Sequence, residues 1–167
     1  WMNEHDIFYK KLSEHSIEGG DVIVDGHRVF IGIGHRTSMD AIKVLQKELT
    51  DFDILPIVFN PKYLHLDCVF NILSAKDALI FPDALDKNMV ELLSSMYNLI
   101  EVSESEQFSM GTNVLSIGQN RVISLPINHD VNLQMRQHGY QVIEVDFSEI
   151  IKSGGSFRCC SIPIERR

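Results

Sequence analysis

The same order of predicted elements, strand, strand, helix and strand, returns three times along this chain of 167 residues. The three units span about residues 18–60, 65–104 and 111–148. In each unit two apolar runs are followed by a helix-like pattern of apolar residues, and a third apolar run closes the unit. Repeats of roughly 45 residues are typical of modules that bury their faces against one another. The pattern therefore predicts an α/β fold of about three ββαβ modules.

Local signals refine the first unit and the end of the chain. Asp25 and Gly26 form a dipeptide suited to a tight hairpin between "GGDVIVDG" and "HRVFIGIG". Ser38 has the side chain of an N-cap for the helix "SMDAIKVLQKEL". After the third unit, "SFRCCSIPI" (residues 156–164) predicts a final strand without a partner in the chain. An exposed edge of this kind is expected to be covered by another chain or by self-association.

Composition excludes several classes of protein. Apolar residues make up 44% and charged residues 23%, as in ordinary globular domains, and the net charge is −8. This acidic balance argues against a general nucleic-acid or anionic-membrane surface, and no apolar run reaches the roughly 18 residues of a membrane span. The first residues lack the apolar core of a signal peptide, and three cysteines do not make a disulfide framework. We therefore expect no nucleic-acid or membrane partner and a cytoplasmic location.

The run "YLHLDCVFNIL", residues 63–73, is typical of a strand but carries His65 and Asp67 two positions apart. On a strand the two side chains would share a face. Their burial would cost several kcal/mol unless a partner met them there. Either the fold satisfies them, as for a hydrogen-bonded core histidine or a turn-capping aspartate, or they meet a ligand.

Further polar residues recur at the start of each module's first strand. Glu18 precedes the first, His65 and Asp67 precede the second, and Asn113 opens the third, while Cys159 lies in the predicted final strand. If the modules surround a common axis, these residues converge there. A thiolate can attack a planar cationic carbon, two carboxylates can hold a guanidinium, and an imidazole can protonate the leaving amine. The set therefore suits nucleophilic catalysis on a guanidinium group.

Two other kinds of site are less compatible with the sequence. His65, Asp67 and Cys68 on one strand cannot all face one metal ion, and no second cluster has zinc spacing. Cys159 and Cys160 lack the C-x-x-C spacing of redox pairs, and a disulfide between neighbours is strained. As neighbours on a strand, one of the two should be packed and the other exposed, while Cys68 has the character of a small core residue. We expect no metal and no cofactor.

Four segments, "EGGDVIVDGHRVFIGIGHRTS", "HLDCVF", "GTNVLSIG" and "GGSFRCCSIPIERR", together resemble the guanidine-modifying enzymes of the pentein superfamily. These are arginine deiminases, dimethylarginine dimethylaminohydrolases and glycine amidinotransferases, and the resemblance covers nearly the whole chain from Ile17 onward. It implies a five-bladed α/β propeller of ββαβ modules around an axial active site. About three modules are present, so the chain resembles the C-terminal part of a longer protein. A missing N-terminal part or self-association is expected to cover its open faces.

The resemblance also implies roles for single residues. Cys159 matches the nucleophile, and His65 matches the general acid and base. Glu18 and Asp67 match the two ligands of the guanidinium, with Glu18 counted among the catalytic residues.

Three further residues are weaker candidates for substrate binding. Arg36, in "GHRTS", matches a position that binds the substrate's carboxylate in some members, although a solvated arginine at a helix start is an equal alternative. Arg158 is a candidate of the same kind. Asp21 is expected to orient the site.

The reaction implied by the resemblance is hydrolysis of the guanidinium group of arginine or methylated arginine through a covalent thiouronium. Amidinotransferases share its first half but pass the amidino group to an amine, and the segment "HLDCVF" with the adjacent cysteines favours the hydrolases. A third possibility is a catalytically incomplete fragment that acts as a binding or assembly module, as in similar anti-association factors of the ribosome. Those propellers lack a catalytic cysteine, so the combined Glu, His, Asp and Cys set argues against that role.

Overall fold

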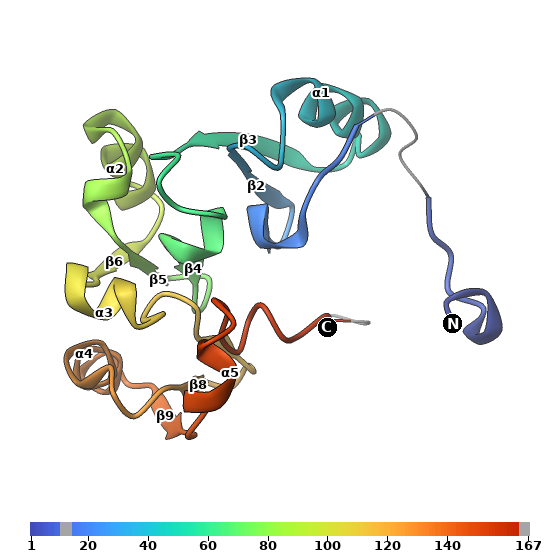
Figure 1. The fold of residues 1–167 in the computed structure, drawn as a ribbon. Coiled ribbons are helices and arrows are strands. Elements are labelled where there is room, and N and C mark those ends of the chain that lie inside the picture. Colours follow the sequence, from blue (N-terminus) through green and yellow to red (C-terminus); the bar gives the residue numbers. More distant parts are fainter. Residues whose placement is uncertain (11–14, 164–167) are drawn as a thin grey trace.

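The computed structural model describes residues 1–10 and 15–163 and has a mixed α/β fold with three separate three-stranded sheets. In each sheet the first strand is antiparallel to the second, and the third is parallel to the second. Parallel neighbours need a crossover, which a helix supplies in each sheet. The sheets follow one another along an arc, with α1, α2 and α4 on its outer side (Figure 1). The predicted α/β class is confirmed, whereas the propeller arrangement stays a prediction.

The first sheet has three strands, β1 (Val22–Asp25), β2 (Arg28–Ile33) and β3 (Asp53–Val58). A two-residue turn joins β1 to β2, and its Gly26 has a φ of +57°, which glycine adopts without strain. Helix α1 (Met39–Glu48) leads from β2 to β3. It begins after Ser38, whose hydroxyl accepts a hydrogen bond from the Ala41 N–H, as expected of an N-cap.

The second sheet has three strands, β4 (Phe70–Ile72), β5 (Asp77–Ile80) and β6 (Asn98–Glu101). All four residues of β5 are buried, because β5 is the central strand and neighbouring elements cover both of its faces. Helix α2 (Lys87–Ser94) follows β5 and is capped by Asp86, whose carboxylate accepts the Met89 N–H at 2.8 Å.

The third sheet has three strands, β7 (Leu115–Ser116), β8 (Arg121–Ser124) and β9 (Gln141–Glu144). Its helix, α4 (His129–Gln137), begins against the carboxylate of Glu106. This carboxylate accepts the N–H groups of Asp130 and Val131, at 2.8 and 3.0 Å. A negative group at a helix N-terminus satisfies free N–H donors and complements the helix dipole.

Several short helices lie outside the repeated strand, strand, helix and strand pattern. Two are α-helical, α3 (Glu104–Phe108) and α5 (Ser148–Ile151). Four are single 3₁₀ turns, η1 (Asn3–His5), η2 (Gly19–Asp21), η3 (Leu66–Cys68) and η4 (Pro82–Ala84). Of these, η2 and η3 directly precede β1 and β4, and both carry candidate site residues.

The hydrophobic core runs between neighbouring modules. Phe30 of β2 contacts Phe70 of β4 edge to face, with 5.7 Å between the ring centroids. A second cluster joins Leu79 of β5 to Val122 of β8. Full burial of one such side chain contributes about 1.5–3 kcal/mol. Each module therefore depends on its neighbour for much of its stability.

Two predictions about secondary structure are wrong. Residues 66–68 form η3 and do not continue the strand, so His65 precedes a 3₁₀ turn, Asp67 lies within it, and the two do not share a strand face. The predicted final strand is not present over residues 156–163, where residues 157–160 form turns, and Ile164 lies outside the described residues. In these turns the Cys160 N–H donates to the Ser156 oxygen at 3.1 Å, a local bond that a strand would not make.

Within the described ranges, none of the helices combines the length and the apolar character needed to cross a bilayer.

Candidate functional site

Glu18 and His65 make the first contact of the candidate site. The Glu18 carboxylate lies 2.6 Å from the His65 Nε2 through one oxygen and accepts the Arg36 Nη1 at 2.9 Å through the other. The hydrogen bond to His65, and then the Arg36 cation, hold the pKa of Glu18 below its usual range. Glu18 is therefore an anion at neutral pH, and one of its oxygens already holds a guanidinium group.

The glycines of "EGGD" leave room for the imidazole. A Cβ atom at Gly20 would lie 2.7 Å from the ring of His65, closer than real Cβ atoms come to other heavy atoms. A side chain at position 20 would therefore displace His65 from Glu18.

Asp21 is fully buried and holds the neighbouring turn in place. One oxygen accepts the Thr37 hydroxyl at 2.7 Å, and the other accepts the Leu66 N–H at 3.0 Å. Leu66 lies between His65 and Asp67 in the chain, so Asp21 fixes the turn that presents both side chains. Its placement agrees with an orienting role, which stays a prediction.

Asp67 is 1% exposed and lies beside the thiol of Cys159. Its Oδ2 is 3.9 Å from the Cys159 Sγ, a distance at which the thiol donates weakly, and 3.6 Å from the Arg158 Nε. Burial raises the pKa of Asp67, and the positive charge of Arg158 offsets this only in part.

Cys159 lies in an exposed turn near the end of the chain. Its N–H donates to the Asn113 Oδ1 at 3.2 Å. Partial removal from water, and then the negative charge of Asp67, raise the pKa of the Cys159 thiol. In the free protein this thiol is therefore protonated at neutral pH.

The other two cysteines differ in their surroundings. Cys160 is exposed like Cys159, so the expectation that one of the pair would be packed is wrong, because both lie in a turn and not on a strand. Cys68 is buried, as predicted, and burial raises the pKa of its thiol to about 12. Cys68 is therefore protonated at neutral pH.

The two arginines have different placements. Arg158 points inward, where its Nη2 donates to the Val22 oxygen at 2.9 Å and its Nη1 lies 3.5 Å from the Asn71 Oδ1. Arg36 is exposed and bound to Glu18. Binding of the substrate's carboxylate by either arginine stays a prediction, and the inward contacts of Arg158 favour a structural role for it.

The repeat did not point to two buried polar residues near the site. Thr37 accepts the Glu18 N–H at 3.2 Å and donates to Asp21, which joins the two acidic residues. Asn71 donates to the Thr112 and Val114 oxygens, both at 2.8 Å. A small polar residue directly after Arg36, and an asparagine within an apolar strand, were the available signals.

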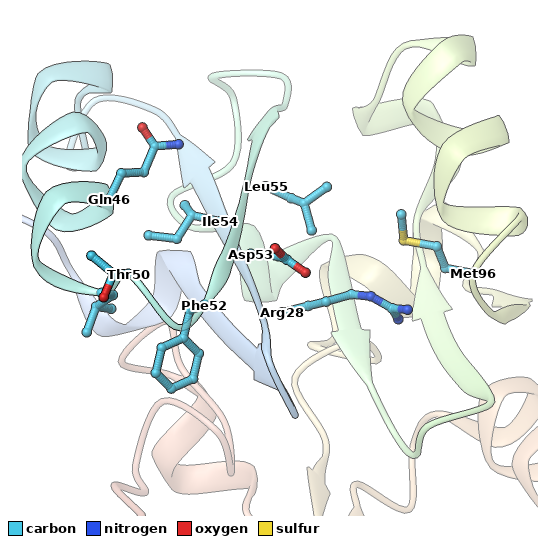
Figure 2. A pocket seen from close by; sticks show the side chains of 9 residues that line it. Arg28, Gln46, Thr50, Phe52, Asp53, Ile54, Leu55 and Met96 are labelled. Atoms are coloured by element: carbon cyan, nitrogen blue, oxygen red, sulfur yellow. The ribbon is translucent and has the colours of Figure 1, made fainter.

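A surface recess lies away from these residues, between the helix side of the first sheet and the end of α2. Figure 2 shows Phe52, Asp53 and Arg28 along it, with Met96 on the opposite side. Arg28 pairs with Asp25 at the far end of β1, whereas Glu18 precedes the beginning of β1. The recess and the candidate site therefore lie at opposite ends of the first sheet.

Comparison with known proteins gives a consistent result. Residues 2–166 match the family described as N,N dimethylarginine dimethylhydrolase, eukaryotic. The chain is 50% identical over 166 residues to the uncharacterized protein YkgA of Bacillus subtilis, which covers 99% of this chain and 58% of that protein. It is 31% identical over 171 residues to N(G),N(G)-dimethylarginine dimethylaminohydrolase of Mycobacterium tuberculosis, which covers 98% of this chain and 54% of that enzyme.

A comparison with a solved structure gives the same family. DDAH from Pseudomonas aeruginosa, a cysteine-to-serine mutant complexed with citrulline, superposes with a TM-score of 0.74 at 25% identity. The match covers 86% of this chain and 54% of that one. The chain thus spans little more than half the length of the curated relatives it matches.

Proposed function

Since this chain belongs to the N,N-dimethylarginine dimethylhydrolase family, and with it to the guanidine-modifying enzymes of the pentein superfamily, we propose that it carries the nucleophile of a guanidino-group hydrolase. The substrate would be arginine or methylated arginine. The observation that carries the proposal is the 3.9 Å contact between the Cys159 sulfur and the Asp67 carboxylate, beside the Glu18–His65 pair. These residues come from distant segments of the chain.

Two carboxylates in this position suit a flat cation. Glu18 already accepts the Arg36 guanidinium at 2.9 Å, so its carboxylate is oriented for such a group. A substrate guanidinium would take the place of the Arg36 group on Glu18 and extend towards Asp67. Paired hydrogen bonds between guanidinium and carboxylate are strong and fix the orientation of the reacting carbon.

Substrate binding would also activate the nucleophile. Burial and the charge of Asp67 keep the Cys159 thiol protonated in the free protein. A guanidinium bound between Asp67 and Cys159 would bring a positive charge beside the sulfur, which favours the thiolate. The nucleophile would therefore form chiefly when a cationic substrate is present.

The proposed reaction has two halves. The Cys159 thiolate forms a bond to the guanidinium carbon, and the C–N bond breaks as His65 gives a proton to the departing amine. His65 then takes a proton from water, the hydroxide adds to the thiouronium carbon, and the C–S bond breaks. The products are a ureido compound, the amine and the free thiol. If an amine instead of water attacks the thiouronium, the same site would act as an amidinotransferase.

The test uses the full-length protein, because this chain spans about half of its relatives. Arginine, monomethylarginine and dimethylarginine are each supplied, with and without glycine, and citrulline, ammonia, alkylamine and amidinated glycine are measured. We expect citrulline with ammonia or alkylamine, and a loss of at least about a hundredfold for Cys159→Ser. Cys160→Ser is the matched control and should keep its activity.

A separate experiment labels the protein with a haloacetamidine probe and identifies the reactive thiol by mass spectrometry. We expect the label on Cys159. Preferential labelling of Cys68 or Cys160, or a full-length protein that yields neither hydrolysis nor transfer, would refute the proposed function.

A further inference from the structure

Asn113 connects the turn that carries Cys159 to the rest of the molecule. It is fully buried, and its Oδ1 accepts the Cys159 N–H at 3.2 Å. Its main-chain oxygen also accepts the Arg158 N–H, at 3.4 Å. One residue therefore binds two consecutive residues of the turn. No sheet includes residues 156–163, so these bonds help to fix the distance between the Cys159 sulfur and Asp67.

The backbone on both sides of Asn113 is itself tied to the segment that carries Asp67. The Asn71 amide donates to the oxygens of Thr112 and Val114, which flank Asn113. The Thr112 hydroxyl donates to the Cys68 oxygen at 2.7 Å. These three hydrogen bonds connect β4 and η3 to the start of β7. Asn113 thus completes a continuous link from Asp67 to Cys159.

The nitrogen of the Asn113 side-chain amide, Nδ2, is a buried hydrogen-bond donor without an acceptor among the described residues. A buried donor left without a partner is unfavourable, and an anion formed beside it would satisfy it. Burial raises the pKa of the Cys159 thiol and of the Asp67 carboxyl, and the nearby Asn113 amide offsets a small part of each increase, although its Nδ2 makes no hydrogen bond to either group in the free protein. Both offsets favour the anionic forms.

We propose that Asn113 is a positioning residue of the reaction, whose amide oxygen holds the Cys159 turn against Asp67 and whose free Nδ2 donor is available to the reacting sulfur. This inference rests on the proposed function, in which Cys159 is the nucleophile. The amide has the two groups that such a role needs, an acceptor for the turn and a donor for the anion. The sequence placed Asn113 among the polar residues at strand starts but gave it no role.

The test follows the alkylation of Cys159 by iodoacetamide as a function of pH, in the full-length protein and with mass spectrometric readout. Asn113→Asp keeps the acceptor but replaces the donor with a negative oxygen, so we expect the midpoint of alkylation to move up by about one pH unit or more. With substrate, kcat should fall at least about tenfold while KM changes less than about threefold. Asn132→Asp is the matched control, because Asn132 is equally buried and donates to the Leu125 oxygen in the third module.

A folded Asn113→Asp variant with an unchanged alkylation midpoint would overturn the inference, as would an equal shift in Asn132→Asp. Should Asn113→Asp not fold, the unsubstituted protein supplies a second measurement. The side-chain amide resonances of Asn113 should titrate with the midpoint of Cys159 alkylation and should lose that titration in Cys159→Ser. Asn113 amide resonances that do not shift at this midpoint would also overturn the inference. Turnover that survives Cys159→Ser refutes the proposed function instead, so the two failures are distinguishable.

Discussion

Asp67 combines functional placement with an energetic cost. It is almost completely buried, and burial raises its pKa despite the neighbouring Arg158 cation. A carboxyl whose pKa is raised on folding is destabilised in its ionised form. The unfavourable contribution is fully present above the folded-state pKa and disappears as the pH falls towards the unfolded value of about 3.9. The ionised Asp67 therefore lowers stability at neutral pH, which agrees with its proposed role as a ligand of a cationic substrate.

Asp67→Asn should accordingly stabilise the protein and abolish its activity. Removal of the buried charge should raise the thermal midpoint at pH 7 by a few degrees, and the difference should shrink near pH 4. Thermal unfolding at both pH values provides the measurement. Asp21→Asn is the contrasting variant, because the Asp21 carboxylate accepts two hydrogen bonds and its loss should lower the midpoint. An unchanged or lower midpoint for Asp67→Asn at pH 7 would contradict this account.

The residue types of the site could be read from the sequence, but their contacts could not. The pattern placed His65 and Asp67 together because they are two apart on an assumed strand. In the structure they are neighbours because Asp21, from another module, binds the Leu66 N–H between them. The Arg36–Glu18 contact and the Asn113–Cys159 bond likewise join positions far apart in the chain. Such tertiary bonds leave no periodic signal along a single sequence.

At the level of elements, one contact recurs between successive modules. Tyr97, directly before β6, donates its hydroxyl to Asp25 in the hairpin of the first module, at 2.6 Å. Tyr140, directly before β9, donates to Asp77 in the second module, at 2.8 Å. Burial raises the pKa of Tyr140 to about 12, so its hydroxyl stays a donor at all ordinary pH values. Both rings are buried, and each fastens a module to the one before it.

Tyr97→Phe and Tyr140→Phe should therefore each lower the free energy of unfolding, although the aromatic ring stays in the core. Each change removes a buried or part-buried hydrogen bond to a carboxylate, at a cost of about 1–2 kcal/mol in the free energy of unfolding measured with urea. Tyr63→Phe is the matched control, since its ring packs against Phe81 and its hydroxyl makes no hydrogen bond among the described residues. Equal costs for all three variants would contradict the recurring contact.

The element types were predictable where they repeat, and not where they occur once. Hairpins, caps and apolar periodicity are local signals, which is why the strands, α1 and its Ser38 cap lie where the sequence predicts them. The run at residues 156–163 has strand-forming residues but no neighbouring strand to bond with among the described elements, so it forms turns. Strand formation depends on an available edge, which composition alone does not reveal.

For the molecule as a whole, the positions that form the tyrosine–aspartate contact between modules can be compared with the same positions at the two ends of the arc. Phe52 stands directly before β3, as Tyr97 and Tyr140 stand before β6 and β9. Yet Phe52 is 38% exposed, because no described module precedes the first one. At the other end the hairpin of the third module, residues 117–120, is also exposed. Phe52 has no hydroxyl and residues 117–120 include no carboxylate, so these two ends expose a ring and a hairpin but cannot repeat the tyrosine–aspartate contact.

The expectation that a further part of the protein or a second copy covers the open faces can be tested on the 167-residue chain alone, for which we predict self-association. Light scattering should give a mass above the 19.0 kDa of one chain, increasing with concentration. Phe52→Ser should return the mass towards 19.0 kDa, because it removes the aromatic ring from the open face. Leu133→Ser is the control, since Leu133 is 53% exposed on α4 and belongs neither to the hairpin 117–120 nor to the first module. A chain that stays at 19.0 kDa at every concentration, or loses association equally in both variants, would show that this face is not covered by a second copy.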